Sequence, residues 1–260
     1  MRLQILRFEV ENIKALIKAV MGKLSREQKL DKIYLSDEDF LRNRAVFEEA
    51  AGAMDVKQVA GAFNKTQYAA ALKMGLDSYE QNGATTCLDV LLDKEYYELL
   101  CNAYQALPKK DKAHAYFYAS MDNDSYVLLA LLRGKNLNYD ANWLRLAVPP
   151  KKFNIPEETV EAMVTADNFD SALKIAQQTQ YGRFFSKAQT PEETIANAES
   201  TFKKAVFSHA KESRLTELFN VGAALAFMVQ KSAEVNNLTV ASLGVEAALE
   251  PQDIQRQMLL

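Results

Sequence analysis

The sequence predicts an all-α protein, and three observations lead to that prediction. Apolar residues recur at the spacing of a single helix face, as in the segments 13–20 and 127–132. The 260 residues include only 9 Gly and 6 Pro, whereas average usage would give about 18 and 13. A chain with so few turn residues has few turns, and long helices need few turns. No segment alternates polar and apolar residues for long enough to predict a strand.

Several helix starts can be read directly from the order of residues. Ser25-Arg26-Glu27-Gln28 has the spacing of a capping box. Asn154-Ile155-Pro156-Glu157 and Thr190-Pro191-Glu192-Glu193 each place a proline and acidic residues in a first turn. A first-turn proline loses no hydrogen bond, and acids there face the positive end of the helix dipole. Helices are therefore expected to begin at these three places.

The composition excludes several classes of function. The formal net charge is −3, so the chain lacks the basic excess that attracts nucleic acid. Cys87 and Cys101 are the only cysteines, and with two histidines they make a zinc site unexpected. The longest uncharged apolar run, at 221–229, is much shorter than the roughly 18 residues of a membrane span. We expect no metal and no cofactor, and membrane contact only through a partner.

A search for catalytic motifs finds none. Gly22-Lys23 and Gly134-Lys135 lack both the upstream glycine and the following hydroxyl residue of a phosphate-binding loop. No Gly-x-Ser-x-Gly nucleophile elbow occurs. The two acids of Asp122-Asn123-Asp124 lie two residues apart, so on a helix they point in different directions. The sequence therefore predicts a non-catalytic protein with no catalytic residues.

An internal repeat is the most informative feature of the chain. Glu9-Val10-Glu11-Asn12-Ile13 returns as Asp122-Asn123-Asp124-Ser125-Tyr126 and again as Glu234-Val235-Asn236-Asn237-Leu238, at sequence offsets of 113 and 112. Thr66-Gln67-Tyr68 and Thr179-Gln180-Tyr181 keep the offset of 113. Several matches in one register along so much of the chain favour a true repeat over chance.

The repeat divides the chain into units 1–121 and 122–233, followed by residues 234–260 as the first half of a third unit. Polar residues that recur in the repeat, or that follow its long helices, are candidate repeat or interface positions. These candidates are Glu9, Asn12, Asp122, Arg133, Lys135, Glu234 and Asn237.

The repeat and three further segments resemble one known family. The segments are the stretch Leu-Asp-Val-Leu-Leu-Asp-Lys-Glu-Tyr-Tyr at 88–97, the helix end Leu132-Arg133-Gly134-Lys135, and Asn220-Val221-Gly222 through Ala226-Phe227. In order and spacing they resemble the C subunit of archaeal and bacterial A/V-type rotary ATPases, which corresponds to the d subunit of the eukaryotic V-ATPase. The resemblance covers essentially the whole chain.

The resemblance implies an all-helical funnel of three similar units around a pseudo-threefold axis, with the third unit incomplete here. Members of the family sit peripherally on the cytoplasmic face of the membrane. They bind the proteolipid ring and receive the foot of the central stalk. A rotor part of this kind catalyses nothing and binds no cofactor. It couples rotation to the transport of protons or sodium ions.

The sequence also departs from the family pattern. Asp124-Ser125 stands where the family helix usually has Asn, and residues 241–245 lack the basic ending seen at Arg133. The family carries a further helical segment before the position of Met1, and by the repeat it would form the second half of the third unit. The apolar side chains within 234–260 are therefore expected to lack part of their cover, and self-association through this open unit becomes one expected outcome. These side chains are Leu238, Leu243, Leu249 and Ile254.

Two alternatives belong to other functional classes. A helical-repeat adaptor would bind other proteins in a concave face. Its repeat would be about 34–47 residues long, shorter than the period of 113 found here, although sub-repeats could be contained within it. An all-α enzyme with an aspartate-bound magnesium ion is the more remote alternative. It depends on Asp37-Glu38-Asp39 and Asp122-Asn123-Asp124, whose acids two residues apart point in different directions on a helix.

Overall fold

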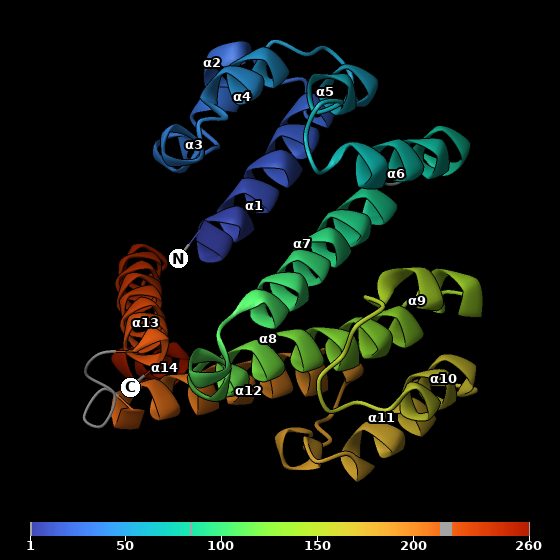
Figure 1. Cartoon of the computed structure of the whole chain (residues 1–260), viewed down its shortest axis with the longest axis vertical. Helices are drawn as coiled ribbons and strands as arrows, with labels where there is room; N and C mark the ends of the chain where they lie inside the picture. The colour runs from blue at the N-terminus through green and yellow to red at the C-terminus, as the bar shows by residue number, and fades with distance from the viewer. Residues whose placement is uncertain (1, 84, 214–219, 260) are drawn as a thin grey trace. The chain divides into compact units, whose positions relative to one another are not determined.

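The computed structural model describes residues 2–83, 85–213 and 220–259, and every regular element in these ranges is a helix (Figure 1). The all-α prediction is confirmed for this part of the chain. The funnel and its pseudo-threefold axis stay predictions. None of the helices described combines the length and the apolar character that crossing a bilayer requires.

The chain forms two compact units, which are described separately below. One comprises Met1–Ala103 with Leu146–Lys151, and the other comprises Tyr104–Arg145 with Lys152–Leu260. The helices in chain order are α1 (Arg2–Met21), α2 (Arg26–Leu30), α3 (Leu35–Leu41), α4 (Arg44–Ala51), α5 (Val56–Ala62), α6 (Ala69–Asn82), α7 (Thr86–Ala106), α8 (Lys109–Asn136), α9 (Ala141–Ala147), α10 (Glu157–Thr165), α11 (Phe169–Gln178), the 3₁₀ turn η1 (Gly182–Phe184), α12 (Pro191–Ser213), α13 (Val221–Glu246) and α14 (Pro251–Gln257).

In the first unit the long helix α1 is the centre of the core. It contacts α2, α3, α4 and α5. The apolar stripe predicted for this helix is buried, with Ile13, Leu16 and Ile17 completely inaccessible to solvent. Phe47 of α4 and Phe63, which follows α5, meet edge to face with their ring centroids 5.0 Å apart. The first stripe predicted from the sequence is thus confirmed.

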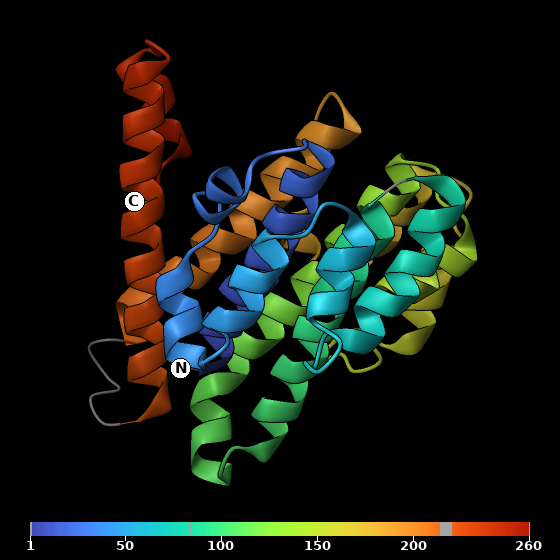
Figure 2. The same cartoon turned by 90° about the horizontal axis from the view of Figure 1, so that it is seen from above.

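In the second unit α8 takes the central place. It contacts α11, α12 and α13, and α14 folds back against α13 (Figure 2). Val127, Leu128, Leu131 and Leu132 are completely buried, as the second predicted stripe requires. The buried side chains at the helix crossings of this unit are aliphatic and aromatic, and include Leu144, Phe184 and Phe202. Burial at about 25 cal/mol per Å² of apolar surface is the main force that holds such crossings together.

The predicted helix starts are confirmed where the structure describes them. The Ser25 hydroxyl accepts a hydrogen bond from the Gln28 N–H, and the Gln28 side chain accepts one from the Ser25 N–H, which completes the capping box. At the start of α12, the Glu193 N–H donates to the Thr190 hydroxyl at 3.2 Å. Helix α10 begins at Glu157, directly after Pro156. The caps at Ser25 and Thr190 satisfy backbone donors that a helix end leaves unpaired.

Three long helices end in the same way. After α1, α8 and α13 the chain places Lys23, Asn138 and Ala248 in the left-handed region, at φ of 53°, 55° and 53°. The next N–H then reaches back to a carbonyl five residues earlier, at 3.1, 2.9 and 2.9 Å respectively. This is the Schellman motif, here without the usual glycine. A short helix begins three residues after each left-handed residue.

These turns define a structural register between the long helices. Ala19, Gly134 and Gly244 supply the carbonyls that close the three turns. The register, as an offset in residue number, is therefore 115 from α1 to α8, 110 from α8 to α13, and 225 from α1 to α13. The sequence offsets of 113 and 112 have the same total, but they place the middle helix two residues too early.

We predict that Gly134→Ala destabilises the fold. A Cβ at Gly134 would lie 2.2 Å from Cδ2 of Leu144, whose side chain is completely buried and cannot move aside freely. Overpacking costs about 1–3 kcal/mol, more than the roughly 1 kcal/mol that alanine gains over glycine inside a helix. Thermal or urea unfolding measures the change.

Gly61→Ala is the matched control for this prediction. Nothing lies within 4 Å of a Cβ built at Gly61, which is an exposed position of α5. This substitution is expected to raise the free energy of unfolding through helix propensity alone. If both substitutions changed the free energy of unfolding in the same direction, the close approach of α8 to Leu144 would be contradicted.

Candidate functional site

Each compact unit buries one carboxylate of its central helix against a tyrosine hydroxyl. In the first unit Glu9 of α1 is only 2% exposed. The Tyr68 hydroxyl donates to Oε2 of Glu9 at 2.6 Å, and the side-chain amide of Asn43 donates to Oε1. Tyr68 and Glu9 are 59 residues apart in the sequence. The two hydrogen bonds therefore join the body of α1 to two distant segments.

The second unit repeats this arrangement around Asp124 of α8, which is completely buried. The Tyr181 hydroxyl donates to Oδ2 of Asp124 at 2.8 Å, and the side-chain amide of Asn154 donates to the same oxygen at 3.3 Å. The backbone N–H groups of Phe153 and Asn154 add bonds of 2.9 and 2.8 Å. The Tyr116 hydroxyl in turn donates to Oδ1 of Asn154. The carboxylate is thus satisfied on both oxygens.

The same local turn presents each tyrosine to its carboxylate. In Thr66-Gln67-Tyr68 the threonine hydroxyl donates to the carbonyl three residues earlier at 2.8 Å, and accepts the Tyr68 N–H at 3.3 Å. In Thr179-Gln180-Tyr181 the corresponding distances are 2.7 and 3.2 Å. We call this arrangement the Thr-x-Tyr turn. It follows α5 in one unit and α11 in the other.

The hydrogen bonds correct one candidate position. The sequence register pairs Glu9 with Asp122, but the acceptor of the Tyr181 hydroxyl is Asp124. Asp124 follows Glu9 at an offset of 115, the same register that the Schellman turns define. The cause is a connection shorter by two residues, since 57 residues separate carboxylate from tyrosine in the second unit and 59 in the first.

Asn12 and Asn237 make equivalent hydrogen bonds to the backbone 22 residues further along the chain. The Asn12 amide donates to the Tyr34 carbonyl at 3.2 Å and accepts the Tyr34 N–H at 2.9 Å. Asn237 of α13 makes the same pair of bonds with the backbone of Leu259, both at 2.8 Å. The separation in sequence is 22 residues in both cases. Each asparagine therefore fixes the chain that returns after the short helix.

The other candidates take part in contacts within their own unit. Arg133 donates to Glu199 of α12 at 2.6 Å. Lys135 donates to the last carbonyls of α10 at 2.7 and 2.6 Å, and so caps that helix. Glu234 is exposed and accepts a bond from Lys231 at 2.6 Å. The candidates of the second unit therefore form no single cluster. Arg133 and Lys135 lie on α8, whereas Glu234 and Asn237 lie on α13.

The apolar residues expected to lack cover are mostly exposed. Leu238, Leu243 and Leu249 are large hydrophobic side chains on the surface of the second unit. Ile254 of α14 differs, because it packs on Gly244 of α13.

Burial controls the electrostatics of the second network. It raises the pKa of Asp124, and the hydrogen bonds from the Phe153 N–H, the Tyr181 hydroxyl and Asn154 only partly offset this effect. Burial and the negative charge of Asp124 both raise the pKa of Tyr181. The phenol therefore keeps its proton and remains a donor. Such a pair ties two segments of the unit together.

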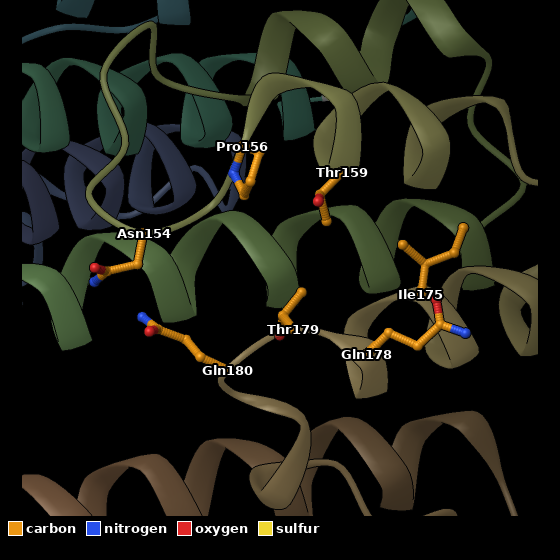
Figure 3. Close-up of a pocket in the computed structure, with 7 residues that line it drawn as sticks. All are labelled: Asn154, Pro156, Thr159, Ile175, Gln178, Thr179 and Gln180. Carbon is orange, nitrogen blue, oxygen red and sulfur yellow. The ribbon is translucent and has the colours of Figure 1, made fainter.

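A pocket of about 420 Å³ lies between the start of α10 and the end of α11. Figure 3 shows Asn154 and Gln180 at one end and Ile175 with Gln178 at the other. The residues that line it are Asn154, Pro156, Thr159, Ile175, Gln178, Thr179 and Gln180. Their amides and hydroxyls can form hydrogen bonds but do not titrate near neutral pH. No group of three potential metal ligands occurs among the described residues.

We predict that Tyr68→Phe and Tyr181→Phe each lower the free energy of unfolding by about 1–3 kcal/mol, because each removes a donor from a buried carboxylate. Chemical denaturation measures the loss. Tyr34→Phe is the control, since the Tyr34 side chain is 68% exposed and the residue contributes its backbone to the Asn12 contact. Losses no larger than that of the control would contradict a stabilising role.

We also predict a specific pH dependence for Asp124. Its pKa in the native state lies above the unfolded value of about 3.8. From pH 3.8 up to the native pKa the native state binds more protons, so the contribution of Asp124 to stability falls as the pH rises. Asp124→Asn removes this contribution. The difference in unfolding free energy, wild type minus variant, should decrease with increasing pH, and an increase would contradict the raised pKa.

Comparison with known proteins places the chain in a family. The family model described as ATP synthase (C/AC39) subunit matches residues 1–257. The C subunit of the A-type ATP synthase of Methanothermobacter thermautotrophicus is 25% identical over 270 residues, which cover 99% of this chain and 67% of the relative. The protein of the same name from Methanocaldococcus jannaschii is 24% identical, over 97% of this chain and 63% of the relative.

A third relative, from Methanosphaera stadtmanae, is 23% identical over 98% of this chain and 66% of its own length. The chain thus spans about two thirds of the length of the curated relatives it matches. No solved structure matches it significantly. The match over residues 1–257 shows that the chain belongs to the ATP synthase (C/AC39) subunit family.

Proposed function

We propose that the chain is a non-catalytic rotor subunit of an A/V-type ATP synthase or ATPase. In this role it couples the central stalk to the membrane proteolipid ring during rotation-driven transport of protons or sodium ions. The observation that carries the proposal is the family match over almost the entire chain. Relatives that match along the same length are named as the C subunit of A-type ATP synthases.

The geometry supports a mechanical role. A part that transmits torque has to resist sliding between its helices. In each unit, buried hydrogen bonds join the central helix to a tyrosine 59 or 57 residues further on. Buried polar networks whose members are satisfied rigidify a core and specify one arrangement. The two carboxylate–tyrosine pairs are therefore suited to carry load between helices.

Three similar elements support the proposed repeat architecture. Helix pairs α1/α2, α8/α9 and α13/α14 share the left-handed turn residue, the Schellman bond and the spacing to the short helix. An arrangement around a pseudo-threefold axis would place these pairs at equivalent positions. We propose that the chain sits peripherally on the cytoplasmic face and reaches the membrane only through its partner subunits. The absence of a spanning helix from the described residues is compatible with this arrangement.

Purification from native membranes under mild conditions tests the proposal. A tagged chain is expected to bring the stalk subunits and the proteolipid ring in a fixed ratio. In complexes assembled without the chain, ATP-driven ion transport should be lost while ATP hydrolysis by the soluble head continues. Full transport without the chain would contradict the role. Recovery of unrelated clients instead of ATPase subunits would favour the helical-repeat adaptor.

A further inference from the structure

None of the described residues that line the pocket between α10 and α11 is ionisable. The pocket volume of about 420 Å³ lies within the range of about 300–1,000 Å³ that small-ligand sites occupy. Pro156 and Ile175 are apolar, and the other five lining residues carry an amide or a hydroxyl group. A charged ligand would lose water here without gaining an ionic partner, which is unfavourable. The lining therefore favours an uncharged ligand that has both hydrogen-bond donors and acceptors.

Two polar side chains of the pocket are available to such a ligand. Within the described ranges, the Thr159 hydroxyl and the Gln178 amide form no hydrogen bond with another part of the chain. Thr159 is half-buried and Gln178 is exposed. Figure 3 shows Thr159 on the α10 side of the pocket and Gln178 on the α11 side. A ligand that lies between the two helices can therefore form hydrogen bonds with both of them.

Elsewhere in the chain, side-chain amides already bind peptide groups. The Asn12 amide binds both backbone groups of Tyr34. The Asn237 amide binds both backbone groups of Leu259. A primary amide carries a donor and an acceptor side by side, and these match the N–H and C=O groups of one residue. The ligand that fits the Gln178 amide best is therefore a peptide backbone.

We propose that the pocket binds a short peptide segment whose side chains are uncharged. The Gln178 amide pairs with the N–H and C=O groups of one residue of this segment. The Thr159 hydroxyl forms a hydrogen bond with a neighbouring peptide group, and Ile175 contacts an apolar side chain. This inference does not depend on the rotor role, because it rests on the chemistry and geometry of the pocket.

Binding in the pocket is coupled to the buried network of the second unit, because two residues belong to both. Asn154 lines the pocket and donates hydrogen bonds to Asp124 and to the Tyr181 hydroxyl. Thr179 lines the pocket and accepts the Tyr181 N–H. A bound segment restricts both residues and opposes local opening of the network. The backbone amides of Asn154 and Tyr181 should therefore exchange with solvent more slowly when the peptide is bound.

The first unit indicates a substitution that tests the pocket without disturbing the fold. At the offset of 113 that relates the two Thr-x-Tyr turns, Gln178 corresponds to Lys65. Both residues are exposed, and each directly precedes the threonine of its turn. A lysine is therefore compatible with this position. Gln178→Lys replaces the paired donor and acceptor of the amide by a charged group that only donates.

The probe is the capped tripeptide acetyl-Ala-Ala-Ala-amide, which is titrated into the isotopically labelled full chain. The amide chemical shifts of residues 154–159 and 175–181 are expected to change and to saturate. Gln178→Lys and Thr159→Val should each weaken binding by roughly tenfold, the equivalent of one hydrogen bond. Gln252→Lys makes the same change of charge at an exposed position of α14 outside the pocket. It is the matched control and should leave binding unchanged.

Two further probes distinguish a peptide site from other uses of the pocket. A version of the tripeptide with methylated backbone nitrogens has lost its N–H donors, and it should bind at least tenfold more weakly because the Gln178 oxygen then has no partner. Maltose is uncharged and rich in hydroxyl groups but has no peptide group. It should not displace the tripeptide.

Three results would overturn the proposal. One is a titration in which the amides around the pocket show no saturable change. The second is an affinity that responds neither to Gln178→Lys nor to methylation of the peptide backbone. The third is displacement of the tripeptide by maltose, which would make the pocket a sugar site. The co-purification of ATPase subunits is a separate readout, so this proposal and the rotor role can fail independently.

Discussion

A buried carboxylate that accepts a tyrosine hydroxyl fixes the central helix of each compact unit. Burying an ionised group is costly unless donors replace the lost water. Glu9 receives its donors from Tyr68 and Asn43, and Asp124 receives a larger set that includes two backbone N–H groups. Because these donors come from segments far apart in the sequence, the bonds form only when the helices are correctly placed. The interaction therefore selects one packing among several that the apolar stripes alone would allow.

The Schellman turns determine where the long helices stop, and this fixes their register. Lys23, Asn138 and Ala248 adopt left-handed backbone conformations that cost a non-glycine residue about 1–2 kcal/mol. That cost is offset by two satisfied carbonyls and by the close packing of the short helix that follows. The close approach is clearest at Gly134 against Leu144 and at Gly244 against Ile254. The Schellman turn thus determines where each long helix ends. In α1 and α8, the hydrogen bond between carboxylate and tyrosine then fixes the position of the helix body.

Much of the fold could be predicted from the sequence, because it depends on local patterns. The stripes of 13–20 and 127–132 and the cap at Ser25 require only neighbouring residues, and all of them are confirmed. The choice between Asp122 and Asp124 depended instead on the length of the chain between carboxylate and tyrosine, which is two residues shorter in the second unit than in the first. Because the repeats share few identical residues, the sequence does not reveal such a change. A second aspartate two residues after the predicted one was the only available signal.

Other parts of the site had no local signal. Nothing near Asn43 or Asn154 indicates that their amides reach carboxylates that lie 34 and 30 residues away in the sequence. Lys135 lies in the last turn of α8, as its place in the sequence indicated, but nothing in the sequence showed that its ammonium group caps α10 through the carbonyls of Val164 and Ala166. Long side chains reach across helix crossings, and the partner they choose depends on tertiary packing. The family resemblance, which rests on the order of several weak motifs, is confirmed by the match over residues 1–257.

The central claim is that Asp124 and Tyr181 form one energetic unit, and a double-mutant cycle tests it most directly. Unfolding free energies are measured for Asp124→Asn, Tyr181→Phe and the double variant. The account predicts a coupling of roughly 0.5–3 kcal/mol, the range for residues in one hydrogen-bonded network. The parallel cycle with Asp122→Asn should be additive to within about 0.5 kcal/mol. Additivity at Asp124, or coupling at Asp122 instead, would contradict the account.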